Sequence, residues 1–131
     1  MVRILIVDDH AHIRRIVRVL LEAEDGWVVC GEAADGQQAI DQSKLLDPQV
    51  IVLDLHMPLV NGFEAARIIH LRSPKTSILV LTTDESVHFA RAAAASGALG
   101  FMSKAHTTDH LVTAISSLLR GERYFSPVEA K

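Results

Sequence analysis

The sequence predicts an α/β fold in which five parallel strands form one doubly wound sheet and a helix follows each strand. Five short apolar runs without polar alternation recur along the chain, as is typical of strands covered on both faces of a sheet. Helical spacing of apolar residues, or helix start and stop signals, marks the segments between these runs. Because right-handed crossovers join neighbouring parallel strands, the expected strand order at this size is 2-1-3-4-5.

The apolar runs place the five expected strands at residues 2–7, 27–30, 50–53, 78–81 and 99–102. After the first run, apolar residues recur at helical spacing, at Ile13, Ile16, Val17, Leu20 and Leu21. Asp35 and Gln38 stand three residues apart, as an N-cap residue and its partner do in a capping box. A second helix is therefore expected to begin there.

Three further helices are expected in the second half of the chain. The third covers about residues 62–71, the fourth is alanine-rich and covers 86–96, and the fifth begins near Thr107 or Thr108. Each ends at a residue that breaks helices, and these are Ser73-Pro74, Gly97 and Gly121. The fifth helix has one apolar face, formed by Leu111, Ile115, Leu118 and Leu119.

The composition predicts a single, mildly acidic domain. The chain has 131 residues, enough for one domain, and 49% of them are hydrophobic. Thirteen basic and 16 acidic residues give a net charge of −3, so this segment should not bind nucleic acid by electrostatics. The sequence shows no run long enough to span a bilayer and no signal peptide, so a cytoplasmic protein that does not enter the membrane is expected.

Polar side chains suited to phosphate and metal chemistry stand at the ends of four expected strands. Asp8 and Asp9 stand at the end of the first strand, and Asp54 at the end of the third. Thr82 stands at the end of the fourth strand and Lys104 at the end of the fifth. Open parallel sheets bind ligands at the carboxyl ends of their strands, where the strand order reverses, here between the first and third strands. An acidic pair in a loop is often only solvated, and Asp54 by itself could cap a helix. The convergence of four separate segments predicts a site instead.

The charge of this cluster restricts its chemistry. Three neighbouring carboxylates repel one another unless a cation lies between them. Oxygen donors suit a hard ion such as Mg²⁺, which favours sites shared with phosphate groups. Lys104 can neutralise a carboxylate or hold a phosphoryl oxygen, and the Thr82 hydroxyl can donate to the same oxygen. An acidic nucleophile, a metal ion, a lysine and a hydroxyl together form a set for phosphoryl transfer.

Four motifs span the carboxyl ends of these strands: "IVDD" at 6–9, "VLDLHMP" at 52–58, "LTT" at 81–83 and "GFMSK" at 100–104. In this order and spacing they resemble the receiver domain of two-component response regulators, over about residues 2–121. The resemblance implies a flavodoxin-like, CheY-like fold and a signalling domain that accepts a phosphoryl group from a sensor histidine kinase. Such a domain is not an enzyme with an external substrate, because it catalyses only its own phosphorylation and dephosphorylation.

The same resemblance implies a role for each acidic residue. Asp54 is the expected phosphoacceptor. Asp9 resembles the direct Mg²⁺ ligand, and Asp8 resembles the ligand that acts more indirectly, through water. Asp54 and the backbone carbonyl of His56 would complete the protein ligands, so the imidazole ring of His56 is not implied as a ligand.

The resemblance also implies a conformational switch. Thr82 and Lys104 would hold the phosphoryl oxygens. Phe101 matches the aromatic position that moves inward as Thr82 moves toward the phosphoryl group. This movement would change the face formed by the fourth helix, the fifth strand and the fifth helix.

The chain departs from the family pattern at two positions. Lys104 is followed by Ala105, where many receivers have a proline with a cis bond; a cis bond before a residue other than proline costs about 3–4 kcal/mol, so a trans bond is expected. Thr83 stands at a position where receivers often have alanine. We therefore expect slower phosphoryl chemistry in this chain than in a Thr83→Ala variant.

The His56 side chain either tunes the rate of hydrolysis or is a solvated loop histidine. Among the seven histidines no pair shows convincing ligand spacing on one face, so no second metal site is expected.

The last ten residues, "ERYFSPVEAK" at 122–131, resemble the linker of LuxR-type regulators (the NarL/FixJ family). Residues 1–121 are therefore expected to form the receiver, and 122–131 to begin a linker to a DNA-binding domain that controls transcription. The alternative is a stand-alone receiver that acts by protein–protein interaction. Candidate homodimer faces are the fourth helix, fifth strand and fifth helix, or the first and fifth helices.

Three other function classes fit the residues less well. A phosphatase with an aspartate nucleophile would need a second acid at the position of His56, and its nucleophile would lie on the first strand. A flavodoxin-like cofactor binder would need a loop rich in Ser, Thr or Gly after the first strand, where Asp8 and Asp9 would repel a phosphate. A receiver that signals without phosphorylation would not need the acids, Thr82 and Lys104 together.

Overall fold

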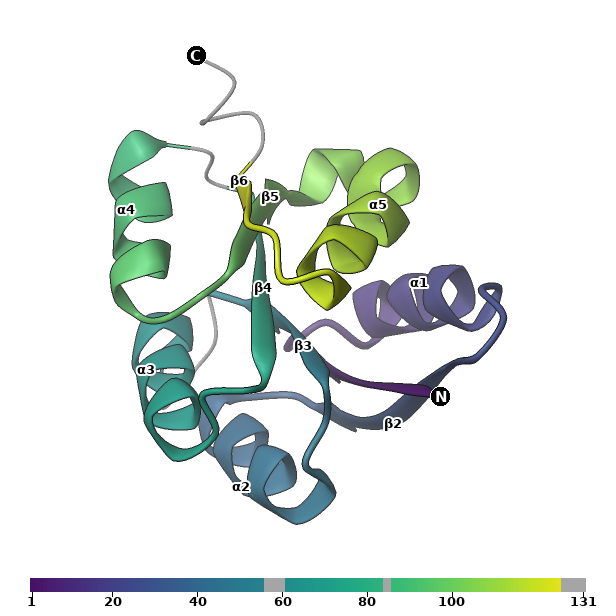
Figure 1. Cartoon of the computed structure of the whole chain (residues 1–131), viewed down its shortest axis with the longest axis horizontal. Helices are drawn as coiled ribbons and strands as arrows, with labels where there is room; N and C mark the ends of the chain where they lie inside the picture. Colours follow the sequence, from purple (N-terminus) through teal and green to yellow (C-terminus); the bar gives the residue numbers. More distant parts are fainter. Residues whose placement is uncertain (56–60, 84–85, 126–131) are drawn as a thin grey trace.

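Six parallel strands in the order β2-β1-β3-β4-β5-β6 form the centre of the computed structural model, which describes residues 1–55, 61–83 and 86–125 (Figure 1). The strands are β1 (Val2–Val7), β2 (Trp27–Ala33), β3 (Val50–Asp54), β4 (Ser77–Thr82), β5 (Gly100–Ser103) and β6 (Tyr124–Phe125). The predicted order of the first five strands is confirmed. The sequence order reverses between β1 and β3, which are direct neighbours in the sheet.

Helices cover both faces of this sheet. They are α1 (Ala11–Glu22), α2 (Gly36–Leu46), α3 (Gly62–Arg72), α4 (Val87–Ala95) and α5 (Thr107–Leu119), with a short 3₁₀ helix, η1 (Lys104–His106), before α5. Figure 1 shows α1 and α5 on one face and α2, α3 and α4 on the other. In the described segments no helix is both long and apolar enough to cross a bilayer.

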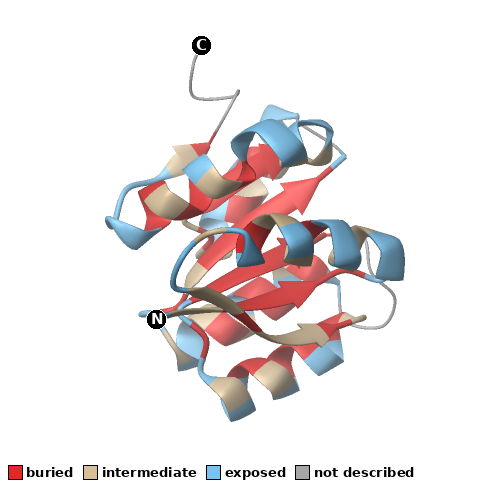
Figure 2. Cartoon of the chain, turned by 90° about the vertical axis from the view of Figure 1, so that its right-hand side faces the viewer, coloured by how far each residue is buried: buried red, intermediate tan, exposed pale blue. Residues whose placement is uncertain are grey.

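Alternate residues of each strand enter two separate cores. Ile51 and Leu53 of β3 pack with α2, α3 and α4, whereas Val50 and Val52 pack with α1 and α5. All five β3 residues are buried, which explains why the sequence shows a continuous apolar run instead of alternation. Figure 2 shows the same arrangement, with buried residues on the sheet and exposed residues on the outer helix faces.

Side-chain caps fix where three of the helices begin. Asp35 accepts a hydrogen bond from the Gln38 backbone N–H at 2.8 Å, so the predicted start of α2 is confirmed. Asn61 caps α3 and Ser86 caps α4 in the same way.

Gly62, the first residue of α3, allows this helix to begin close to the end of β3. A Cβ atom at position 62 would lie 2.5 Å from the Leu55 Cα atom and 2.6 Å from the Asp54 carbonyl oxygen. Any larger residue would push α3 away from the strand that carries Asp54. The glycine therefore helps to hold the carboxyl end of β3 in place.

The sixth strand was not expected, because Tyr124 and Phe125 lie in the segment predicted as a linker. They pair in parallel with β5, and Phe125 stands opposite Phe101. The Phe125 ring is 4% exposed and stacks on the Phe101 ring, with 6.0 Å between centroids and 11° between planes. Burial of this aromatic side chain explains why the segment joins the sheet after the turn at Gly121.

Candidate functional site

The candidate site lies at the carboxyl ends of β1 and β3, where the sequence predicts it. Asp54 is the last residue of β3 and Asp8 directly follows β1; they are 2% and 3% exposed. Asp9 is more exposed. Side-chain ligand atoms of Asp8, Asp9, His10 and Asp54 all lie within 4.8 Å of one another. The fold therefore brings the three predicted carboxylates together, and two of them, Asp8 and Asp54, are almost fully buried.

Lys104 supplies the positive charge next to the two buried acids. Its Nζ atom lies 2.9 Å from Asp8 Oδ2 and 3.2 Å from Asp54 Oδ1. Burial lowers the pKa of Lys104, but the hydrogen bond to Asp8 and the charges of Asp54 and Asp8 outweigh this effect and raise the pKa above its ordinary value. Lys104 therefore remains a cation and bridges the two strands on either side of the reversal point.

His10 also belongs to the cluster, although the sequence analysis assigns it no role. Its Nδ1 atom lies 2.9 Å from Asp9 Oδ1 and 3.2 Å from Asp8 Oδ1. Its backbone N–H donates to Asp8 Oδ1 at 2.9 Å. The adjacency of His10 to the two acids in "VDDH" was the available signal, but the ring direction depends on how α1 begins.

A pair of arginines braces the loop that carries the acids. Arg14 donates from Nη1 to the Asp8 carbonyl oxygen at 2.6 Å and from Nε to Glu32 at 2.8 Å. Arg18 donates to the other Glu32 oxygen from Nε and Nη2, at 2.9 and 2.8 Å. Burial raises the pKa of Glu32, but the hydrogen bonds and charges of Arg18 and Arg14 outweigh this and hold the pKa below its ordinary value.

This brace carries no signal in the sequence, because its partners lie on different elements, α1 and β2. Arg14 and Arg18 are one helical turn apart, and Glu32 is near the end of the second strand. Only the packing of α1 against β2 shows that they meet. The consequence for the site is mechanical, since Arg14 fixes the backbone of Asp8.

Thr82 and Phe101, which the resemblance implies as switch residues, lie on the neighbouring strands β4 and β5. Thr82 is the last residue of β4 and is fully buried, and β4 pairs directly with β3. Thr83, the next residue, is exposed. Phe101 on β5 is fully buried, with its ring against Phe125. His56, whose backbone carbonyl is a predicted ligand, lies outside the described residues.

The donor set of the cluster fits Mg²⁺. Three carboxylates supply only oxygen atoms, which is the chemistry that this ion prefers in proteins. Asp8, Asp9 and Asp54 are close enough to share one ion, and Lys104 balances part of the charge of Asp8 and Asp54. Asp8, Asp9 and Asp54 are thus the residues that could hold the ion.

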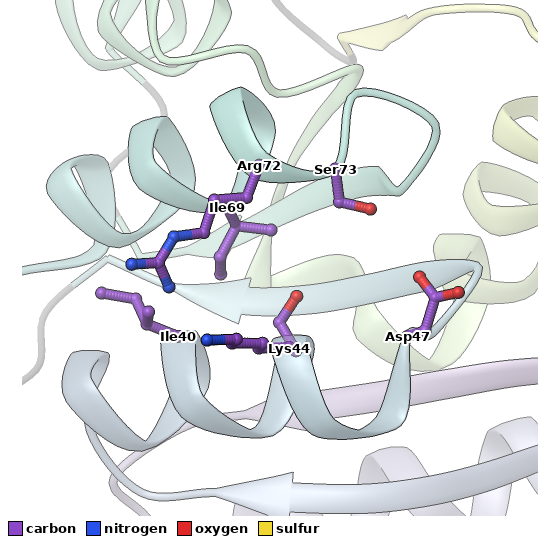
Figure 3. Close-up of a pocket in the computed structure, with 7 residues that line it drawn as sticks. Ile40, Lys44, Asp47, Ile69, Arg72 and Ser73 are labelled. Atoms are coloured by element: carbon purple, nitrogen blue, oxygen red, sulfur yellow. The ribbon is translucent and has the colours of Figure 1, made fainter.

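A separate cavity of about 300 Å³ lies between α2 and α3, lined by Ile40, Ser43, Lys44, Asp47, Ile69, Arg72 and Ser73 (Figure 3). Asp47 follows α2 and precedes β3, and Ser73 follows α3 and precedes β4. These positions are at the amino ends of the strands, whereas Asp54 is at a carboxyl end. The cavity is therefore not part of the acidic site.

Comparison with known proteins agrees with this geometry. The family model "Response regulator receiver domain" matches residues 4–116. The response regulator GacA of Pseudomonas viridiflava is 33% identical over 127 residues, which cover 97% of this chain and 59% of the relative. The transcriptional regulatory protein DegU of Brevibacillus brevis is 32% identical over 126 residues, 96% of this chain and 53% of the relative. The chain thus spans somewhat more than half the length of these curated relatives.

Solved structures show the same architecture. A LuxR-family two-component response regulator from Aurantimonas sp. SI85-9A1 superposes with a TM-score of 0.92 and 37% identity, over 98% of this chain and 91% of that one. The RcsB response regulator of Salmonella typhimurium gives a TM-score of 0.91 at 26% identity, over 98% of this chain and 66% of that one. The predicted CheY-like fold is confirmed, and the chain belongs to the receiver-domain family of two-component response regulators.

Proposed function

We propose that Asp54 accepts a phosphoryl group from a phosphohistidine of a sensor histidine kinase, with Mg²⁺ held by Asp8, Asp9 and Asp54. The observation that carries the proposal is the Lys104 bridge, which reaches both buried carboxylates within 3.2 Å. A structural ion pair would need one acid; here a cation and three acids surround the end of the strand that presents Asp54. His56 would add its backbone carbonyl to the metal ligands.

The transfer step follows from these positions. A carboxylate oxygen of Asp54 attacks phosphorus while the bond from phosphorus to the histidine nitrogen breaks, and its electron pair remains on the imidazole. Bound Mg²⁺ would offset negative charge on the phosphoryl oxygens. Lys104 would also offset this charge, and the Thr82 hydroxyl would donate to an oxygen of the transferred group. Hydrolysis of the acyl phosphate later returns Asp54 to its free form.

Phosphorylation would be read out through Thr82 and Phe101. A ligand shifts a conformational equilibrium only by binding one state more tightly, and the contacts of the phosphoryl group with Thr82 and Lys104 supply this difference. Phe101 lies on β5, one strand from Thr82, and stacks on Phe125. The movement would therefore reach both the α4–β5–α5 face and the segment that follows α5.

We place this receiver in a cytoplasmic regulator of transcription. The relatives are named as response and transcriptional regulators, and the rest of their length leaves room for a DNA-binding domain. In this proposal DNA is bound by that domain and not by the receiver. Homodimers would form through α4, β5 and α5, or through α1 and α5. A stand-alone receiver is the alternative, and sequencing of the downstream coding region distinguishes the two.

Beryllofluoride with Mg²⁺, which imitates a phosphoryl group on an acid, tests the proposed acceptor. Amide NMR spectra of the wild type should shift at Thr82, Lys104 and Phe101, and Asp54→Ala should show none of these shifts. Asp25→Ala is the matched control, because Asp25 is exposed and lies before the amino end of β2, whereas the site is at the carboxyl ends of the strands. Unchanged shifts in Asp54→Ala would refute the assignment.

A further inference from the structure

A second cluster of metal-binding side chains lies at the junction of η1 and α5. His106 is the last residue of η1, and Asp109 and His110 belong to the first turn of α5. One ligand atom from each of the three lies within 4.8 Å of the others. The two imidazole rings are 5.2 Å apart between centroids. This cluster shares no residue with the acidic site and the transfer chemistry does not use it.

The spacing of these residues explains why they converge. Positions i and i+4 of a helix lie on one face, one turn apart, and position i+3 lies beside them. His106 and His110 have the first spacing, and Asp109 stands three residues after His106. The expectation that no two histidines show ligand spacing on one face was therefore wrong. The η1 turn continues into α5 and extends the helical spacing back to His106.

The His110 ring contacts the Tyr124 hydroxyl group. His110 Nδ1 lies 3.2 Å from the Tyr124 hydroxyl oxygen. When Nδ1 carries the proton and donates to this oxygen, Nε2 keeps its lone pair for a metal ion. Histidine ligands in proteins commonly donate their second ring N–H to an oxygen in this way, which fixes the ring and its tautomer.

We propose that His106, Asp109 and His110 form a site for a divalent transition-metal ion of the zinc type. Two imidazoles and one carboxylate are a donor set that Zn²⁺ accepts and that Mg²⁺ does not favour. Within the described part of the chain, Asp109 makes no ion pair that would compete for its carboxylate. Three protein donors leave a fourth tetrahedral position for water.

The ion would connect three elements of the face beside β5. His106 belongs to η1, His110 to α5, and Tyr124, which orients His110, to β6. An ion that binds only the folded chain stabilises it by a free energy that grows with the logarithm of the ion concentration above the dissociation constant. The site shares no ligand with the proposed phosphorylation site at Asp54, so either proposal can fail without the other.

Zn²⁺ titration of the whole chain tests the site. Competition with a chromogenic chelator is measured at pH 7.5 with Mg²⁺ in excess to occupy the acidic cluster. The wild type should bind one Zn²⁺, His106→Gln and His110→Gln should each weaken binding at least tenfold, and Tyr124→Phe should weaken it about tenfold. His88→Gln is the matched control, since His88 is an exposed histidine on α4, and it should bind as the wild type does.

Two outcomes would overturn the proposal. One is wild-type affinity in the His106→Gln/His110→Gln double variant, which would place any bound ion elsewhere. The other is loss of binding in Asp9→Asn with retention in the double variant, which would assign the ion to the acidic cluster. Urea unfolding without metal shows that each variant folds, and the ring C–H resonances of His106 and His110 should shift with Zn²⁺ in the wild type.

Discussion

Replacement of Lys104 by methionine separates the charge of this residue from its packing. The methionine keeps most of the length of the side chain and removes the ammonium group that lies 2.9 Å from Asp8 and 3.2 Å from Asp54. The side chains of the two acids are 4% and 2% exposed, so bulk water screens their charges poorly once the cation is lost. Without Mg²⁺, the variant leaves two carboxylates buried with no lysine between them.

The expected loss of stability is large for one residue. At about 3 Å and an effective dielectric constant of about 20, each contact contributes roughly 5 kcal/mol before the cost of removing the charges from water. Removing one partner of a buried ion pair destabilises proteins by about 3–5 kcal/mol. Because the Lys104 side chain is 15% exposed, we expect the lower end of that range, about 3 kcal/mol. The melting temperature should fall by roughly 10 °C.

Urea unfolding, followed by Trp27 fluorescence and circular dichroism, measures this loss with and without Mg²⁺. Saturating Mg²⁺ should return part of it, because the ion supplies the missing positive charge. Lys75→Met is the control, since Lys75 is exposed between α3 and β4, and it should stay within about 0.5 kcal/mol of the wild type. A Lys104→Met variant as stable as this control in the absence of Mg²⁺ would refute the reasoning.

Three further predictions concern Glu32 with its two arginines, Thr83 after β4, and Phe125 in β6. The folded-state pKa of Glu32 is depressed, so Glu32 adds stability above its unfolded pKa and loses this contribution as the pH falls through the folded pKa. Glu32→Gln should be about 1 kcal/mol less stable than the wild type in urea unfolding at pH 7, and this difference should shrink as the pH falls through the folded pKa of Glu32. Thr83 is exposed and directly follows Thr82. Phosphorylated Thr83→Ala should lose its phosphoryl group faster than the wild type in a dephosphorylation assay, because the smaller side chain restricts water less. Phe125→Ala removes a ring that is 4% exposed and should lower the urea-unfolding free energy by about 2 kcal/mol, less than in a core interior because β6 can detach locally.

The strands and the three acids could be predicted from the sequence because their signals are local. A continuous apolar run such as 50–53 indicates a buried parallel strand by itself. Asp54 follows that run directly, and the rule that parallel strands end at one edge brings it to Asp8 without any knowledge of side-chain packing. Lys104 could be assigned to the same site because it follows the fifth strand, whose carboxyl end lies at the same edge of the sheet.

The residues that were missed depend on contacts between elements. Glu32 meets Arg14 only because α1 packs on β2, and residues 18 positions apart carry no pairing signal. The pairing of His106 with His110 was not expected, because the 3₁₀ turn that brings His106 onto the face of α5 has no clear signal in the sequence. Phe125 joins the sheet because its ring stacks on the ring of Phe101. The glycine and proline on either side of it in the sequence indicated only a linker.

The connection from the acidic site to α5 runs through backbone contacts around Lys104. Lys104 is the first residue of η1, and the Ser103 hydroxyl accepts the Ala105 N–H at 3.1 Å, which fixes the start of this turn. The Thr107 hydroxyl donates to the Lys104 carbonyl oxygen at 2.8 Å, where η1 becomes α5. If Asp54 is phosphorylated as proposed, a displacement of the Lys104 backbone would reach the first turn of α5 through the Thr107 hydrogen bond. A movement of the Lys104 ammonium group alone would leave that hydrogen bond intact, because the side chain is flexible.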